Sequence, residues 1–307
     1  MSSPYRQPMS PWSGLAQYTR RVILPDSLGL HIYDSGTSDK PPALLVHGLG
    51  DDADTWRHIF DPLTGHFRVI ALDLPGFARS DPAPGAYRMP FFKDFLLQLM
   101  DTLSIQRVTF VGHSMGAFIS QYIALECPDR VAKLILLDGT VISRVQKINR
   151  QLLLFLTPVI GEWLYNRLRK DPQAAYATLQ PYYANLDALP EADRRFLFER
   201  VNQRVWSDTQ RVAYFSSLRD LARWAPRQRR KMESQLAESL TPTLLVWGGQ
   251  DQINPLENAH ICLEIQPVAH LVVIPQAGHN LQQERPGELI DAILEFLSKE
   301  GSDGPNP

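Results

Sequence analysis

The chain has 307 residues, of which 44% are hydrophobic and 21% are charged, close to the average composition of soluble globular proteins. This composition excludes a disordered chain, a collagen-like repeat and a coiled-coil rod. The 31 basic and 33 acidic residues leave a net charge of −2, so the overall charge gives no reason to expect a nucleic-acid partner.

Cysteine content and hydropathy indicate where such a chain resides. Cys127 and Cys262 are too few for a disulfide framework and lack the spacing of metal ligands. The first twenty residues are polar and contain prolines, without the apolar core of a signal peptide. The most apolar run, residues 152–160, is less than half of the roughly 20 residues that a membrane span requires. We therefore expect a cytoplasmic protein without a transmembrane segment.

Short apolar runs alternate with longer helix-period patterns along most of the chain, after an N-terminal extension over residues 1–19. This alternation predicts an α/β fold, a mostly parallel eight-stranded sheet flanked by helices. The expected strands are, in chain order, Arg21–Leu24, Leu30–Asp34, Ala43–His47, Arg68–Leu72, Arg107–Gly112, Lys133–Leu137, Thr243–Trp247 and His270–Ile274. The expected helices between them are Asp54–Phe60, Pro90–Leu103, Met115–Glu126, Leu256–Glu264 and Leu281–Lys299.

One long segment, residues 139–240, interrupts this alternation. It shows only helix-period patterns and is too long for a loop, which predicts an all-helical insertion. The core domain would then consist of residues 20–138 and 241–299, followed by a disordered tail over residues 300–307. The insertion contains 17 basic and 10 acidic residues, so it carries +7 and the remainder carries −9. A solvated helical face explains this charge most simply, and attraction of anionic groups on a ligand or a membrane surface is the alternative.

The motif Gly112-His113-Ser114-Met115-Gly116 follows a predicted strand and opens a predicted helix. A Gly-x-Ser-x-Gly sequence at such a turn is a nucleophile elbow. The turn is so tight that Cβ atoms two residues before and after the serine would collide, which explains Gly112 and Gly116. The pattern therefore predicts that the Ser114 hydroxyl stands at the carboxyl edge of the sheet. His113 is expected to pack or to hydrogen-bond within the elbow.

A serine hydroxyl needs an adjacent base at neutral pH, and His279 is the best placed of the eight histidines. It lies between the last predicted strand and the last predicted helix, at the same sheet edge as Ser114. The carboxylate that orients such a histidine is expected to be Asp251, directly after the preceding strand. Asp138, at the end of another strand, is the rival candidate, whereas Asp73 is expected to organise its own turn.

An oxyanion hole requires two preorganised N–H donors. The Met115 amide lies at the start of a predicted helix, where N–H groups are free. The segment His47-Gly48-Leu49-Gly50 follows the third predicted strand, and its Leu49 amide is the expected second donor. His47, Gly48 and Gly50 are expected to support this loop.

Together these motifs resemble those of the α/β-hydrolase fold superfamily, over roughly residues 20–140 and 241–299. The segments that look like the strand-end motifs of the family are 44–50, 73–80, 246–251 and 277–279. The resemblance implies that the insertion is a helical cap that covers the site. One departure is Ala78, where many members have glycine; it is expected to stiffen that loop without affecting the chemistry.

The resemblance and the Ser-Asp-His order favour a serine carboxylesterase or lipase-like hydrolase. Ser114 argues against haloalkane dehalogenases and epoxide hydrolases, which use an aspartate nucleophile. Carbon–carbon bond hydrolases of ring-cleavage products are similar in length, but they usually have asparagine before the serine and tryptophan after the histidine, where this chain has His113 and Asn280. Those hydrolases, cofactor-free haloperoxidases and acyltransferases stay open as alternatives. A non-enzymatic binding protein is disfavoured because no triad residue is missing.

The expected partner is a small ester with an apolar acyl or alcohol group. The insertion is rich in aromatic residues, most of which would form its own core while a minority would line an acyl pocket. These residues are Trp163, Tyr165, Tyr176, Tyr182, Tyr183, Trp206, Tyr214, Phe215 and Trp224. The chemistry requires neither a metal nor a cofactor, so none is expected.

Overall fold

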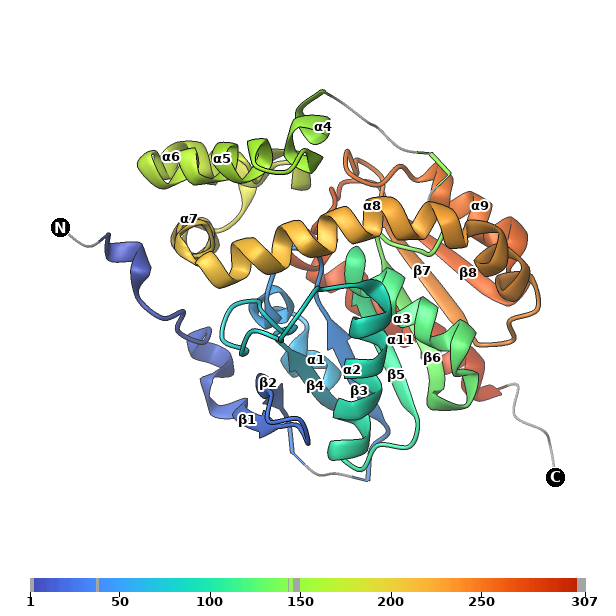
Figure 1. The fold of residues 1–307 in the computed structure, drawn as a ribbon. Coiled ribbons are helices and arrows are strands. Elements are labelled where there is room, and N and C mark those ends of the chain that lie inside the picture. Colours follow the sequence, from blue (N-terminus) through green and yellow to red (C-terminus); the bar gives the residue numbers. More distant parts are fainter. Residues whose placement is uncertain (1–2, 37–38, 143, 146–149, 303–307) are drawn as a thin grey trace.

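A computed structural model describes residues 3–36, 39–142, 144–145 and 150–302. Its centre is an eight-stranded sheet with the strand order β1-β2-β4-β3-β5-β6-β7-β8 (Figure 1). Strand β2 runs antiparallel to both of its neighbours, and the neighbouring pairs from β4 to β8 are parallel. The strands are β1 Thr19–Ile23, β2 Gly29–Asp34, β3 Pro42–Val46, β4 Arg68–Leu72, β5 Val108–His113, β6 Val131–Leu137, β7 Thr243–Gly248 and β8 Ala269–Ile274. This sheet confirms the predicted fold class.

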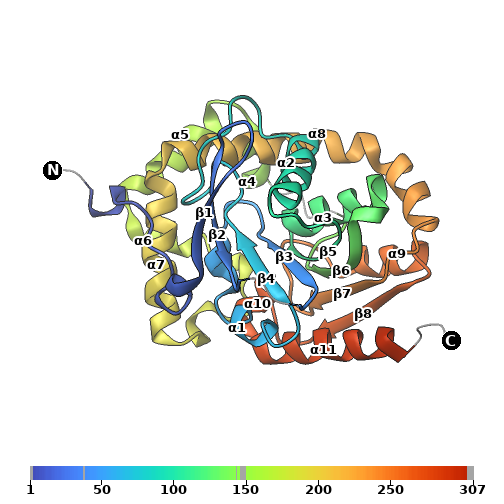
Figure 2. The same cartoon turned by 90° about the horizontal axis from the view of Figure 1, so that it is seen from below.

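The helices lie on both faces of the sheet, so that Figure 2 shows the strands between α2 and α3 on one side and α1 and α11 on the other. Their bounds are α1 Phe60–Leu63, α2 Met89–Thr102, α3 Met115–Glu126, α4 Arg150–Leu156, α5 Ile160–Arg167, α6 Pro172–Ala177, α7 Glu191–Trp206, α8 Asp208–Ala237, α9 Glu257–Ile265, α10 Leu281–Glu284 and α11 Pro286–Ser302. No helix among the described residues is long and apolar enough to cross a bilayer.

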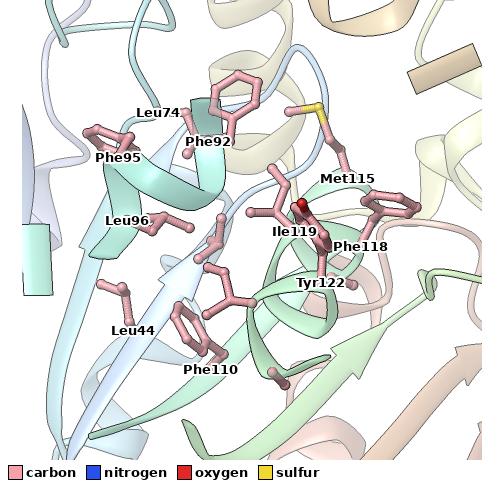
Figure 3. Packing of buried hydrophobic residues seen from close by; sticks show 14 of the residues in the cluster. Leu44, Leu74, Phe92, Phe95, Leu96, Phe110, Met115, Phe118, Ile119 and Tyr122 are labelled. Atoms are coloured by element: carbon pink, nitrogen blue, oxygen red, sulfur yellow. The ribbon is translucent and has the colours of Figure 1, made fainter. Parts of the chain in front are cut away.

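The strands separate two apolar cores because their side chains alternate between the faces of the sheet. In β3, Leu44 packs into the core beneath α2 and α3, whereas Leu45 packs into the core beneath α1 and α11. Figure 3 shows the first core, where Phe92 of α2 lies beside Leu74, and Leu96 of α2 and Ile119 of α3 lie between it and Leu44 and Phe110 of the strands. Because both faces are covered, the central strands are buried along nearly their whole length, as in parallel sheets generally.

Helices α4 to α8 form the insertion between β6 and β7. The 30-residue α8 crosses over the carboxyl edge of the sheet, and α4, α5 and α6 lie on its far side (Figure 1). Hydrogen bonds fasten α8 to the core: Tyr87 N–H donates to Ser216 Oγ at 2.9 Å and Met89 N–H donates to Asp220 at 2.8 Å. These two residues of α8 therefore hold the insertion to the core.

The N-terminal segment, residues 3–18, reaches the insertion. The ring of Trp12 meets Phe196 of α7 edge to face at 4.9 Å, and the backbone N–H of Trp12 donates to Asp54 Oδ1 at 3.1 Å. Arg200 of α7 donates to the backbone oxygen of Ser10 at 2.7 Å. This segment thus joins α7 to the core.

Three expectations about helices need correction. Residues 54–60 are not one helix: a 3₁₀ turn over Ala53–Trp56 precedes the short α1, and the apolar pattern there reflects burial on several sides. The expected last helix is divided between α10 and α11, because Pro286 keeps Arg285 out of the helical region (φ −135°, ψ 52°). The tail was expected to be disordered from residue 300, but α11 continues to Ser302, and residues 303–307 lie outside the described part.

Candidate active site

Ser114 lies in the turn between β5 and α3, with the unusual backbone angles φ 52° and ψ −115°. A Cβ atom on Gly112 would come within 2.6 Å of the Ala117 backbone, and one on Gly116 within 2.1 Å of the Val46 oxygen. Side chains at these two positions would therefore push the turn apart. The hydroxyl-bearing residue is held in this strained turn at the carboxyl edge of the sheet, as the motif predicts.

His279 follows β8 and bridges Ser114 and Asp251. Its Nε2 lies 2.9 Å from the Ser114 Oγ, and its Nδ1 lies 2.8 Å from the Asp251 Oδ2. Burial opposes the charge of Asp251, but the attraction of His279, its hydrogen bond and two backbone N–H donors lower the pKa of the carboxyl below its ordinary value. Residues far apart in sequence thus form one continuous hydrogen-bonded chain of hydroxyl, imidazole and carboxylate.

Asp138, the rival carboxyl, lies beside this chain rather than in it. It is fully buried, with a φ of 47°, and its Oδ1 accepts the Gly248 N–H at 2.8 Å. Its other oxygen, Oδ2, has no partner among the described residues. Burial, then the charge of Asp251, raises the pKa of Asp138 well above its ordinary value. Of the two carboxyls, Asp251 is therefore the one that stays ionised.

His113 is a neutral neighbour of His279. Its Nε2 donates to the His279 carbonyl oxygen at 2.8 Å, and the two rings lie 4.9 Å apart. Burial, reinforced by the nearby His279, lowers the pKa of His113 to about 3. His113 therefore braces the backbone of His279 without charge, in agreement with a local hydrogen-bonding role.

The ligand atoms of His113, Asp138 and His279 lie within 4.8 Å of one another. Both nitrogens of His279 are engaged in the chain described above, and the Nε2 of His113 is bound to a carbonyl oxygen. We therefore assign these three side chains to hydrogen bonding rather than to metal binding.

The predicted oxyanion loop, residues 47–50, lies against the elbow. The His47 Nε2 accepts the Leu74 N–H at 3.0 Å, so its Nδ1 donates to the Gly48 oxygen at 2.7 Å. A Cβ atom on Gly48 would come within 3.2 Å of the Ser114 Cβ. The loop therefore approaches the serine closely at a glycine, and His47 hydrogen-bonds both to the loop and to the Leu74 backbone.

Across this loop lies the insertion. It contributes Arg204 and Gln210, which the sequence analysis did not single out, and Tyr214, which was named only among the aromatic residues of the insertion. Arg204 of α7 forms ion pairs with Asp51 and Asp52, directly after the loop. Gln210 of α8 donates to the Gly50 oxygen at 3.2 Å, and Tyr214 lies 3.1 Å from the position of a Cβ on Gly50. Their helical pattern predicts only that they lie on helices, so the sequence carries no signal that they meet the loop.

The loop that carries His279 also meets the insertion. Glu284 accepts the N–H groups of Gly278 at 2.7 Å and Ala184 at 2.8 Å. The Asn280 N–H donates to the Tyr182 oxygen at 3.0 Å, and the Tyr182 ring lies 5.8 Å from the ring of His279. The insertion thus reaches the base side as well as the oxyanion side of the site.

Comparison with known proteins agrees with this architecture. The chain belongs to the alpha/beta hydrolase fold family, which it matches over residues 41–286. The family match confirms the resemblance seen in the motifs.

Individual relatives carry out different reactions. The chain is similar to the dihydrolipoyllysine-residue acetyltransferase component of the acetoin cleaving system of Pseudomonas putida, with 31% identity over 270 residues, 88% of this chain and 67% of that protein. It is 28% identical to a 2-hydroxy-6-oxononadienedioate/2-hydroxy-6-oxononatrienedioate hydrolase of Burkholderia vietnamiensis, over 94% of this chain and 97% of that protein. A solved structure of a candidate lipase from Acinetobacter baumannii has the same fold, with a TM-score of 0.76 at 21% identity over 93% of this chain and 92% of that chain.

Proposed function

We propose that the protein is a serine hydrolase that cleaves carboxylic esters with apolar acyl or alcohol groups. The observation that carries the proposal is the hydrogen-bonded chain from Ser114 through His279 to Asp251, with distances of 2.9 and 2.8 Å. His279 is in hydrogen-bond reach of the hydroxyl proton that it must remove, and Asp251 fixes the tautomer of the ring.

In the proposed mechanism the Ser114 oxygen attacks the ester carbonyl carbon while His279 accepts the serine proton. The amides of Leu49 and Met115 stabilise the negative charge on the carbonyl oxygen. His279 then protonates the departing alcohol, which leaves an acyl-enzyme on Ser114. Water, deprotonated by His279, attacks this ester and releases the acid.

The proposed apolar substrate agrees with the surroundings of the site. The rings of Tyr182 and Tyr214 lie against the loops that carry His279 and Gly50, so that we propose the insertion as a cap over an apolar pocket. Arg204 and Arg200 of α7 are engaged by core aspartates. Because these arginines are already paired with aspartates, they are not free to bind the carboxylates of a substrate. An uncharged ester is therefore favoured over a dicarboxylate.

A second candidate is hydrolysis of a carbon–carbon bond, which the Burkholderia relative supports because it aligns over 97% of its own length. His113 and Asn280 stand where such hydrolases usually have asparagine and tryptophan. An ester panel and 2-hydroxy-6-oxononadienedioate as substrates distinguish the two reactions. We expect a higher kcat/KM for an apolar ester, and the opposite ranking would favour the second candidate.

The test of the mechanism is Ser114→Ala. We expect it to lower the turnover of a p-nitrophenyl ester by roughly 10³-fold or more and to abolish labelling by a fluorophosphonate probe. Ser120→Ala is the matched control, since Ser120 lies on α3, directly after the elbow, and its hydroxyl donates to the Gly116 oxygen. Ester turnover that survives Ser114→Ala would reject the mechanism.

A further inference from the structure

The insertion exposes apolar side chains over one short segment. Ten large apolar residues are exposed in the described part of the chain, and five of them lie within residues 153–163. We call these five the apolar face: Leu153, Leu154, Val159, Ile160 and Trp163. Val159 is 78% exposed and Trp163 is 56% exposed. Exposed large apolar residues that gather in one short segment mark an interaction site more often than scattered single residues do.

The opposite side of this segment is already occupied. Phe155 of α4 stacks on Phe215 of α8 at 6.1 Å, and Glu162 of α5 pairs with Arg219 of α8 at 2.6 Å. A Cβ atom on Gly161 would come within 2.2 Å of the Phe155 oxygen, so α4 and α5 pack tightly where they join. The apolar face therefore cannot turn inward without breaking these contacts.

Backbone geometry also presents this face to solvent. Val159, between α4 and α5, has a φ of 71°, a conformation that a β-branched residue rarely adopts. The Glu162 carboxylate holds it by accepting the Val159 N–H at 2.8 Å. A strained backbone that exposes an apolar side chain suggests a function for that side chain.

The charges around the face are positive. Residues 144–170 contain six basic residues and one acidic residue, although the whole chain carries −2. Arg144 and Arg169 are paired with Glu233 and Asp208, whereas Arg167 and Lys170 have no acidic partner among the described residues. Arg167 lies 5.0 Å from the centre of the Trp163 ring, next to the exposed apolar residues. Exposed tryptophan and leucine flanked by arginine and lysine is the pattern of segments that lie in the interface of a bilayer.

We propose that the apolar face docks on a lipid surface that carries anionic headgroups. A second copy of the chain fits less well, because a symmetric dimer through this face would bring two positively charged segments together. A bilayer offers apolar depth for the five side chains and negative charge for the surrounding basic residues. Figure 1 shows α4 and α5 on the side of α8 away from the sheet, where a flat surface can approach.

The experiment is flotation of the full chain with lipid vesicles, measured on the Ser114→Ala variant so that binding is separate from hydrolysis. The vesicles contain phosphatidylcholine alone or with about 30% phosphatidylglycerol. We expect binding to the mixed vesicles that is at least about tenfold stronger than to phosphatidylcholine and that weakens as salt is raised.

The variant is Leu153→Gln/Val159→Asn/Trp163→Gln, in which asparagine suits the positive φ at position 159. We expect it to lose about tenfold or more of the vesicle affinity while its melting temperature changes little. The matched control is Ile23→Gln/Leu240→Gln, which removes exposed apolar residues elsewhere and should bind like the parent.

Three results would overturn the proposal. They are failure of the parent to bind the mixed vesicles, equal binding by the face variant, and equal binding to both lipid compositions. A dimer seen by light scattering that the face variant abolishes, without vesicle binding, would instead assign the face to contact between copies. None of these results bears on ester hydrolysis, which is measured separately in solution.

Discussion

At the scale of single residues, the site contains two carboxyls, Asp138 and Asp251, whose pKa values are shifted in opposite directions by their surroundings. Asp251 keeps its charge because His279 and two backbone N–H groups bind it, whereas Asp138 is buried beside that charge and its pKa is raised. Like charges so close together cannot both ionise without a large cost. We therefore expect a neutral Asp138 and an ionised Asp251 at neutral pH.

The two carboxyls should respond differently to conversion to the amide. Asp251→Asn is expected to lower the kcat for an ester by roughly 10³- to 10⁴-fold, because the amide no longer fixes the tautomer of His279. Asp138→Asn should change kcat by less than about tenfold, because the amide replaces an already neutral group. Steady-state kinetics of both variants checks this, and an equal loss in the two would show that Asp138 shares the role of Asp251.

His113 gives a prediction about stability and pH. Its pKa is lowered to about 3 in the folded chain, against about 6.5 in an unfolded chain. Below pH 6.5 the unfolded chain binds a proton that the folded chain does not, so the free energy of unfolding falls as the pH falls. His113→Gln lacks this titration, and the glutamine amide can still donate to the His279 oxygen.

We therefore expect the stability advantage of the parent over His113→Gln to shrink by about 2 kcal/mol between pH 7 and pH 5. Urea denaturation at the two pH values measures this change. Parallel losses of stability in the two proteins would show that His113 is able to protonate in the folded state.

At the scale of elements, the oxyanion loop depends on helices from the insertion. Gly50 has a φ of 77° and lies against Tyr214 of α8, while Arg204 of α7 pairs with the two aspartates that follow the loop. The loop is therefore positioned by β3 on one side and by α7 and α8 on the other.

Gly50→Ala tests this support. The added Cβ would lie 3.1 Å from the Tyr214 ring, so the loop or the helix must shift, and we expect kcat to fall about tenfold or more. Gly85→Ala is the control, because Gly85 has a φ of 100° but nothing within 4 Å of its Cβ position. It should cost about 1 kcal/mol of stability and leave kcat unchanged. A kcat for Gly50→Ala equal to that of the control would mean that Tyr214 does not position the loop.

At the scale of the whole molecule, the N-terminal segment and α7 close over a cluster of buried charges. Arg200 and Arg79 both reach Asp54, and Arg57 lies 5.4 Å from the ring centre of Trp12. Removing one partner of a buried ion pair leaves the other charge buried and unpaired, which destabilises the fold strongly. The segment before β1 therefore contributes to stability although it lies outside the sheet.

Trp12→Ala should lower the free energy of unfolding by about 2–3 kcal/mol, since it removes the ring that packs on Phe196 and Arg57. Trp163→Ala is the matched control, with an exposed ring on α5 that we expect to contribute less than about 0.5 kcal/mol. Urea denaturation of both variants measures the difference. Equal stability of the two would show that the N-terminal segment is not part of the folded unit.

The sequence predicted the strands and the mostly parallel sheet well because each strand is a short apolar run between turns. It also singled out Ser114, His279 and Asp251, because all three follow strands that end at one edge. The contacts of Arg204, Tyr214 and Glu284 could not be predicted in this way. They depend on how the insertion folds back over the core, and helical periodicity specifies a face of a helix but not its partner.

Helix boundaries failed for similar physical reasons. The apolar pattern at residues 54–60 arises because the chain is buried on several sides. Its apolar residues recur at a spacing that also fits the buried side of an α-helix, so the pattern wrongly predicted one. Pro286 indicates a break before α11. The apolar periodicity continues on both sides of this proline, so a single helix was predicted over residues 281–299.

The 30-residue α8 has a consequence for engineering. Its hydrogen bonds reach two core loops, one at Gly50 and one that leads through Tyr87 into α2 at Met89. The side chains of α8 and the backbone of these two loops therefore complement each other. A chimera that received the insertion of a relative without those loops would leave their backbone groups unpaired. Exchange of substrate preference between relatives should therefore succeed more readily by substitutions on the inner surface of α8 than by transplanting the whole segment.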